Sequence, residues 1–146
     1  MPGVVPLKRV AQLNSFGCAA ASVAMVAQVT YGKVMSKVLG SNWRRSNTDH
    51  GLYTSQMIRL LRSEFDMSVG FSRGFDFKSG SRAILFLDNS ILFHAPPRHF
   101  WHCIVWDPAF GGRIIDPGFS RSESRAYYLD LWKRGGRETL IVNPRN

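Results

Sequence analysis

The chain contains 146 residues, of which 45% are hydrophobic and 20% charged, a balance that is typical of one compact globular domain and excludes a disordered or collagen-like chain. Nineteen lysines and arginines against ten acidic residues give a formal net charge of +9. The basic residues are scattered rather than gathered in the blocks of a nucleic-acid module, so a solvated basic surface is favoured over a dedicated nucleic-acid face.

The cysteine content indicates a reducing compartment. Cys18 and Cys103 allow one disulfide at most, whereas secreted disulfide frameworks usually carry four or more cysteines, so a reactive thiol is the better interpretation. No spacing of cysteines or histidines fits a tetrahedral zinc site, and we expect neither a metal nor an organic cofactor. The apolar run at residues 19–27 is far shorter than the roughly 20 residues of a membrane span, and it follows Cys18 in an order that a signal peptide does not have. We therefore expect an intracellular, cytoplasmic protein without membrane insertion.

The first part of the chain is predicted to be helical. Small and apolar residues predict a buried helix over Cys18–Gly32, and a shorter helix is predicted over Val34–Leu39. The polar segment Asn42–Gly51 is expected to be a loop. Thr54 then has the residue type of an N-cap, and the apolar residues of Ser55–Phe65 follow at helical spacing.

After about residue 66 the hydrophobic pattern changes toward a period of two, which predicts strands. The expected elements are strands over Met67–Ser72, Ala83–Leu87 and Ile91–His94, a hairpin of Phe100–Trp106 with Arg113–Asp116 around the loop Asp107–Gly112, a third helix over Ser122–Trp132 and a closing strand over Thr139–Val142. Helices first and strands later indicate the α+β class. We predict one domain over residues 1–146, with a helical part of about 1–65 packed on a strand-rich, antiparallel part of about 66–146.

The segment around Cys18 carries the first chemical signal. Gly17 and Cys18 open the predicted buried helix, where unpaired backbone N–H groups and the helix dipole stabilise a thiolate. A small buried cysteine of purely structural role is the competing interpretation. Gln12 lies six residues earlier, and its amide, together with the N–H of Cys18, could form a two-donor oxyanion hole.

The second signal lies in the predicted hairpin. A histidine at the start of one strand and Asp116 at the end of the next can face each other, so that the carboxylate orients the imidazole. His102 is favoured over His99, because it lies nearly opposite Asp116 if the turn centres on Ala109. Asp107 is a poorer candidate for the orienting acid, since an Asp-Pro at the start of a loop is typical of a turn.

These residues in this order resemble the papain-like cysteine peptidases. The matching features are Gln12, Gly17-Cys18 opening a helix, a His-x-[Ile/Val]-Val strand that begins at His102, and Ile-Ile-Asp-Pro ending at Pro117. Within that group the sequence is most similar, over roughly residues 7 to 118, to the compact domains that process bacteriocin leaders at double-glycine sites. The resemblance implies a papain-like fold, with Cys18 as nucleophile, His102 as base, Asp116 as orienting acid and Gln12 as oxyanion donor.

The function predicted on this basis is a cysteine protease that cleaves a protein substrate through a Cys18 thioester. Papain-like folds also support glutamine deamidation and transglutamination, so these reactions at the same site are one alternative. A basic, non-catalytic binding module is another. The small self-contained triad and the cysteine usage suggest a bacterial effector or toxin domain, and the net charge suggests an acidic or nucleic-acid-associated protein target without direct nucleic-acid chemistry.

Overall fold

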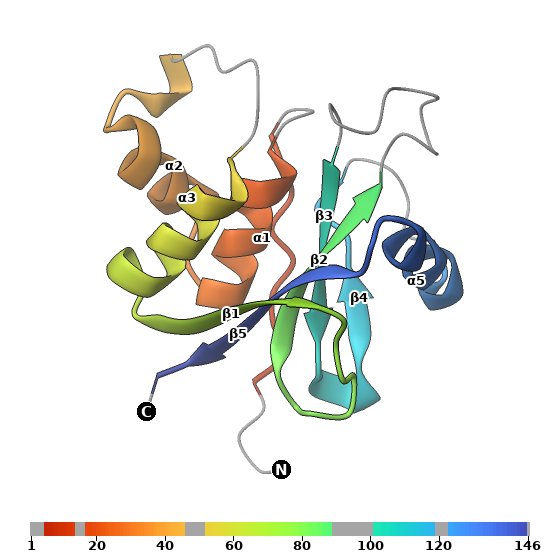
Figure 1. The fold of residues 1–146 in the computed structure, drawn as a ribbon. Coiled ribbons are helices and arrows are strands. Elements are labelled where there is room, and N and C mark those ends of the chain that lie inside the picture. The colour runs from red at the N-terminus through yellow and green to blue at the C-terminus, as the bar shows by residue number, and fades with distance from the viewer. Residues whose placement is uncertain (1–4, 14–16, 46–51, 89–100, 119–122, 146) are drawn as a thin grey trace.

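The computed structural model describes residues 5–13, 17–45, 52–88, 101–118 and 123–145. Within these residues, helices α1 to α3 come first and the strands follow them, with α5 before the last described strand (Figure 1). In chain order the elements are α1 (Cys18–Ala27), α2 (Tyr31–Leu39), the 3-10 turn η1 (Trp43–Arg45), α3 (Thr54–Arg59), the π-helical turn η2 (Leu60–Glu64), β1 (Met67–Arg73), β2 (Arg82–Asp88), β3 (Trp101–Asp107), the 3-10 turn η4 (Ala109–Gly111), β4 (Arg113–Ile115), α5 (Arg125–Arg134) and β5 (Glu138–Pro144).

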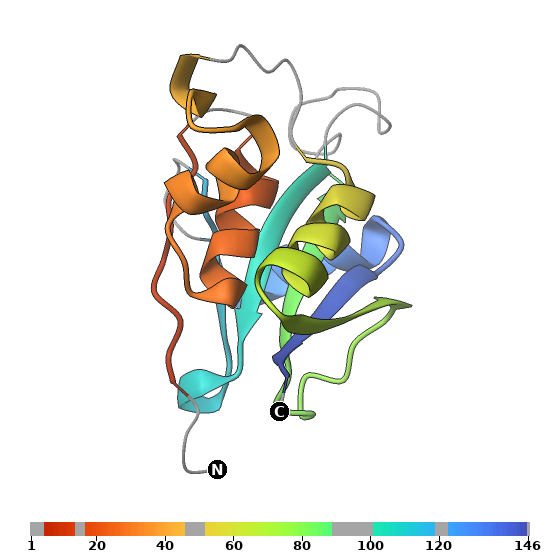
Figure 2. The same cartoon turned by 90° about the vertical axis from the view of Figure 1, so that its left-hand side faces the viewer.

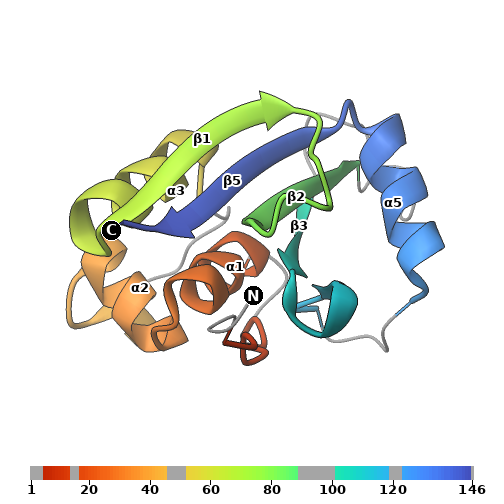
Figure 3. The same cartoon turned by 90° about the horizontal axis from the view of Figure 1, so that it is seen from below.

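The five strands form one antiparallel sheet in the order β1-β5-β2-β3-β4. Helices α1, α2 and α3 lie on one face of this sheet, as the side view shows (Figure 2). Helix α5 lies on the opposite face, which is clearest when the molecule is seen from below (Figure 3). The predicted α+β class, with N-terminal helices packed on an antiparallel sheet, is confirmed.

Helix α1 is the centre of the larger hydrophobic cluster. All of its residues from Cys18 to Val26 are buried, because alanine side chains let the neighbouring helices and the sheet approach closely on several sides. Cys103 and Val105 of β3 face this cluster, whereas Ile104 and Trp106 face a second cluster beneath α5. Alternation along β3 therefore places the two hydrophobic clusters on opposite faces of the sheet.

The predicted helix over Cys18–Gly32 was too long. Helix α1 ends at Ala27, and Gln28 adopts a left-handed conformation with φ of 58°. The side chain of Thr30 then accepts a hydrogen bond of 3.1 Å from the backbone N–H of Lys33, which starts α2 at Tyr31 and not at Val34. This N-cap satisfies an N–H group that the new helix leaves without an intrahelical partner.

The two other predicted helices are present with shifted ends. Tyr53, not Thr54, is the N-cap of α3, and its backbone N–H donates to Gln56 Oε1 at 2.8 Å. The second part of the predicted helix continues as η2 and not as regular α-helix. Helix α5 begins at Arg125, since Ser124 is its N-cap and accepts from the N–H of Tyr127 at 3.2 Å.

The hairpin of β3 and β4 is confirmed, but its register differs from the expected one. Val105 pairs with Ile115, so the hairpin centres on Phe110, and continuation of the register places Asp116 opposite Ile104. The turn is widened by left-handed backbone at Phe110, which has a φ of 56°. Two residues later the chain requires glycine, because a Cβ on Gly112 would lie 2.3 Å from the Trp106 ring.

Some expectations fall on residues that the structure does not describe. The predicted strand Ile91–His94 and the alternative base His99 lie outside the described residues, as do Phe100 and Ser122 at the ends of predicted elements. Among the helices of the described segments, none combines the length and apolar character needed to span a bilayer.

Candidate active site

Cys18 is the first residue of α1, and its side chain is almost completely buried, with 7% exposed. Gly17 is the N-cap of the helix, and its carbonyl accepts from the N–H of Ala21 at 3.0 Å. The first N–H groups of the helix therefore surround the cysteine, and their partial positive charge favours a thiolate over a thiol. The predicted position of the cysteine is confirmed.

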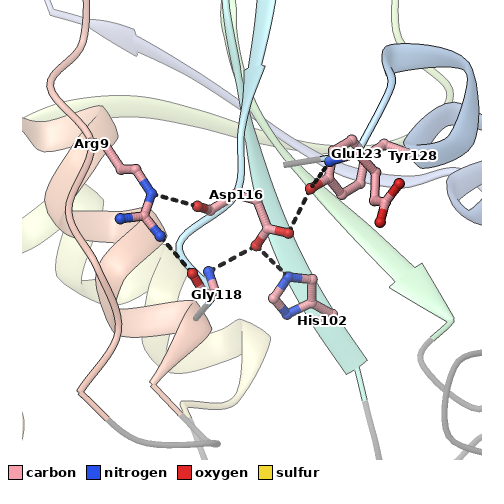
Figure 4. A network of polar contacts seen from close by, with 6 residues as sticks. All are labelled: Arg9, His102, Asp116, Gly118, Glu123 and Tyr128. Atoms are coloured by element: carbon pink, nitrogen blue, oxygen red, sulfur yellow. Dashed lines mark hydrogen bonds and ion pairs between the residues drawn. The ribbon is translucent and has the colours of Figure 1, made fainter. Parts of the chain in front are cut away.

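His102 and Asp116 lie in direct contact, although the register places them two residues apart. His102 Nε2 and Asp116 Oδ1 are 2.7 Å apart (Figure 4). The two side chains meet because alternate residues of a strand point to one face, and a diagonal neighbour is within reach of long side chains. Since Nε2 faces the carboxylate, Nδ1 is the ring nitrogen that remains for a hydrogen bond with Cys18.

Hydrogen bonds, charges and burial at the site shift the pKa values of Cys18 and His102. The pKa of Cys18 is lowered well below its usual value by a hydrogen bond with Cys103 and by the hydrogen bond and charge of His102, which together outweigh the opposing effect of burial. Burial alone would lower the pKa of His102, but hydrogen bonds and charge interactions with Asp116 and Cys18 raise it to about 9. Both shifts favour a Cys18 thiolate beside a His102 imidazolium at neutral pH.

Cys103 is the second thiol of this environment. It follows His102 on β3 and points to the α1 side of the sheet, where it is buried. Its pKa is raised well above the usual value by the hydrogen bond with Cys18 and by burial. Cys18 is therefore the cysteine of the pair that ionises, because it alone gains from the imidazolium.

Asp116 is held by several donors. The backbone N–H of Gly118 donates to Oδ1 at 2.8 Å, and the hydroxyl of Tyr128 donates to Oδ2 at 2.7 Å (Figure 4). A Cβ on Gly118 would lie 3.0 Å from Oδ1, so the glycine allows this close approach of the backbone. Burial alone would raise the pKa of Asp116, but His102 and these donors lower it, and the carboxylate stays charged.

The N-terminal segment, through Arg9 and Gln12, contacts the backbone of residues 116–118. The backbone N–H of Gln12, whose side chain is buried, donates to the carbonyl of Pro117 at 2.9 Å. Arg9 Nε donates to the carbonyl of Asp116 at 2.9 Å, and its Nη2 to that of Gly118 at 2.5 Å (Figure 4). Gln12 is thus fixed beside the loop that carries Asp116, and its role as an oxyanion donor stays a prediction.

Sequence reasoning missed the contributions of Tyr128, Arg9 and Gly118. Tyr128 falls within a predicted helix and has the residue type of a core aromatic, so its hydroxyl contact carries no signal in the spacing. Arg9 is one of many scattered arginines. An Asp-Pro-Gly turn over residues 116–118 gave the only signal, since Asp side chains often accept from the N–H two residues later.

Comparisons with known proteins bear on the fold. No protein-family model matches the sequence, and no curated protein matches it significantly. Among solved structures, one from Bacillus anthracis described as a C39-like peptidase matches with a TM-score of 0.61 and 16% identity, over 99% of this chain and 96% of that one. The peptidase domain of Streptococcus ComA, a bifunctional ABC transporter of a quorum-sensing pathway, matches with a TM-score of 0.62 and 14% identity, over 96% and 98%.

At these identities the likeness establishes the fold. The chain has the α+β architecture of the papain-like C39 peptidases, as the sequence predicted. A buried thiol of lowered pKa, beside a protonated imidazole that a carboxylate orients, can attack an electrophilic carbonyl carbon.

Proposed function

We propose that the chain is a cysteine peptidase in which Cys18 is the nucleophile. The observation that carries the proposal is the line of contacts from Cys18 through His102 to Asp116, with the thiol at the first turn of a buried helix. The fold shared with solved structures described as C39 peptidases supports the same assignment. A catalytic triad is recognised by the geometry and the roles of its nucleophile, base and orienting acid.

The reaction follows from the charges at the site. The Cys18 thiolate attacks the carbonyl carbon of the scissile peptide bond, and the oxyanion accepts from the N–H of Cys18 and the amide of Gln12. The imidazolium of His102 then donates its proton to the leaving amine as the C–N bond breaks, which leaves a thioester. The neutral ring then takes a proton from a water that attacks the thioester, which releases a carboxylic acid and restores the Cys18 thiolate beside the His102 imidazolium.

Two other acyl-transfer outcomes share the first step. If the attacked carbonyl belongs to a glutamine side chain, ammonia leaves, and either water or an amine takes the acyl group. The residues at the site favour none of these acceptors over another. A peptide bond is proposed because the matched solved structures are described as peptidases.

Mass spectrometry of lysate proteins separates these outcomes. Proteins exposed to the wild-type chain and to Cys18→Ala are compared, and new termini that appear only with wild type are the expected result. A mass gain of about one unit at glutamine, or a new cross-link, would instead indicate deamidation or transglutamination. No difference between the two samples would contradict thiol catalysis and favour a binding module.

A simpler test uses alkylation. At mildly acidic pH, iodoacetamide should modify Cys18 and leave Cys103 unmodified, because only a thiol of lowered pKa is ionised there. The matched control is Cys18→Ala, which should not be modified at this pH, because Cys103 stays protonated. Equal and slow labelling of both cysteines would contradict the proposed nucleophile.

The biological setting is a separate part of the proposal. We propose an effector or toxin domain that acts inside a cell on a protein substrate, on the basis of the compact site and the reduced cysteines. Expression of the wild-type chain should harm a sensitive cell, whereas Cys18→Ala should be tolerated. Equal tolerance of both chains would contradict the toxin role and leave the peptidase chemistry open to the mass-spectrometric test.

A further inference from the structure

The hydroxyl of Tyr128 reaches the site from the far side of the sheet. Tyr128 lies on α5, which packs on the face opposite α1, and its side chain is buried, with 3% exposed. The ring joins the smaller hydrophobic cluster together with Leu131 and Trp132. Its hydroxyl Oη donates a hydrogen bond to Asp116 Oδ2 at 2.7 Å (Figure 4).

A second contact fixes the direction of this hydroxyl. The backbone N–H of Glu123 donates to Tyr128 Oη at 3.1 Å. Because a phenol has one proton, and this contact uses an oxygen lone pair, the hydroxyl proton is free to point to the carboxylate. The pKa of Tyr128 is raised to about 12 by burial and by Asp116, so the proton stays on the phenol at working pH.

The two oxygens of Asp116 therefore have different tasks. Oδ1 contacts His102 Nε2 and accepts from the N–H of Gly118, whereas Oδ2 accepts from Tyr128. A carboxylate held at one oxygen can still rotate about its χ2 torsion, which is broad and roughly two-fold. A short bond at the second oxygen opposes that rotation and keeps Oδ1 on the imidazole.

We propose that Tyr128 is a positioning residue for the Cys18–His102 pair, acting through Oδ2 of Asp116. The inference rests on the proposed function, because it gives Tyr128 a task in the reaction that His102 would perform. It makes the docking of α5 part of the active site, although no side chain of α5 is proposed to touch the substrate.

Tyr128→Phe tests the inference, because it keeps the buried ring and removes only the hydroxyl. The matched control is Tyr127→Phe on the same helix, whose side chain is exposed to 37%. We expect kcat to fall about tenfold or more in Tyr128→Phe, as for loss of one hydrogen bond to a charged group, with KM little changed. The NMR titration of the His102 imidazole should move to lower pH in Tyr128→Phe and stay in place in Tyr127→Phe.

A double-mutant cycle shows whether Tyr128 acts through Asp116. In an Asp116→Asn background, Tyr128→Phe should have little further effect on kcat or on the titration of His102. Effects that multiply in the double variant would overturn the inference, as would a single variant that behaves like Tyr127→Phe. The NMR titration needs no substrate, so a shifted His102 titration in a chain without hydrolytic activity would support the positioning role while contradicting the proposed peptidase.

Discussion

The β3–β4 hairpin contains the dipeptide Asp-Pro twice, and its two ends differ in what surrounds the carboxylate. Asp107 precedes Pro108 at the turn, and its side chain is fully buried. It accepts from the backbone N–H groups of Leu7 and Ala109 at 3.0 Å each and from Arg113 Nε at 2.8 Å. These donors are two backbone amides and a guanidinium that together hold the turn, so this end of the hairpin is structural.

Asp116 precedes Pro117 at the open end and has donors of another kind. One donor is an imidazole, a group that can gain and lose a proton, and another is a phenol on α5. Identical dipeptides on one hairpin thus differ in chemistry because of the side chains that reach them. An Asp-Pro signal in a sequence consequently locates a turn, while the partner decides whether its carboxylate takes part in a reaction.

The largest expected effect tests whether the open end of the hairpin is a site at all. Cys18→Ala and His102→Ala should each lower kcat by about 10⁶-fold, because nucleophile and acid–base group act as a unit. Circular dichroism should show both variants folded. If His99→Ala abolished peptide hydrolysis while His102→Ala did not, the assignment of the base would be wrong.

Substitution of the two aspartates compares the ends of the hairpin directly. Asp116→Asn should lower kcat by about 10⁴-fold, because an amide no longer stabilises the protonated imidazole in its working orientation, and Asp116→Ala should likewise leave a small residual activity. Asp107→Asn should leave kcat near that of wild type and lower the free energy of unfolding by about 1–3 kcal/mol, since one buried donor loses its acceptor. Equal losses of kcat in Asp107→Asn and Asp116→Asn, in folded proteins, would remove the distinction between the ends.

A smaller effect is expected at the N-terminal segment that lies beside the open end. Gln12→Ala removes one proposed oxyanion donor and should lower kcat by about 10²–10³-fold. The backbone bond from Gln12 to Pro117 remains in this variant, so the thermal stability should change little. A variant with full kcat would show that the oxyanion hole is built without Gln12.

The pH dependence of kcat/KM also distinguishes Asp116 from Asp107. Above the His102 pKa of about 9 the imidazolium loses its proton, and kcat/KM should fall because the leaving amine has no acid. Below the lowered pKa of Cys18 the thiolate is protonated, and kcat/KM should fall again. Asp116→Asn should move the upper limb to lower pH, since the carboxylate raises the pKa of His102, whereas Asp107→Asn should leave it in place.

The smallest expected effect concerns the net charge of +9. If the positive field speeds the encounter with an acidic protein substrate, kcat/KM should fall as salt rises and shortens the screening length to about 10 Å at 0.1 M, while kcat changes little. A short uncharged peptide is the control substrate and should show no such dependence. A salt-independent kcat/KM for the protein substrate would contradict electrostatic steering.

Much of this arrangement could be predicted from local sequence patterns. Hydrophobic periodicity located the described helices and strands within a few residues, and hairpin geometry predicted the contact of His102 with Asp116. The hairpin register was missed because residue type gives no sign of left-handed backbone at Phe110. The end of α1 was missed for the same reason at Gln28.

The contact of Tyr128 with Asp116 could not be predicted in this way. The contact depends on how α5 packs on the sheet. Helix periodicity indicates which face of α5 is apolar, but it does not identify the polar atom that the Tyr128 hydroxyl contacts. Cys103 illustrates the same limit, since strand alternation separates it from His102 but does not identify Cys18 as its neighbour across the core.

The position of β5 affects when such a site can form. This strand is the last in the chain, yet it lies inside the sheet, where it pairs with both β1 and β2. A ribosome that has synthesised residues 1–118 has made Cys18, His102 and Asp116, but β1 still lacks the strand that joins it to the rest of the sheet. Pairing of distant segments is slow and must wait for the last of them. The sheet that carries His102, and with it the proposed site, is therefore complete only after residues 138–144 have been added.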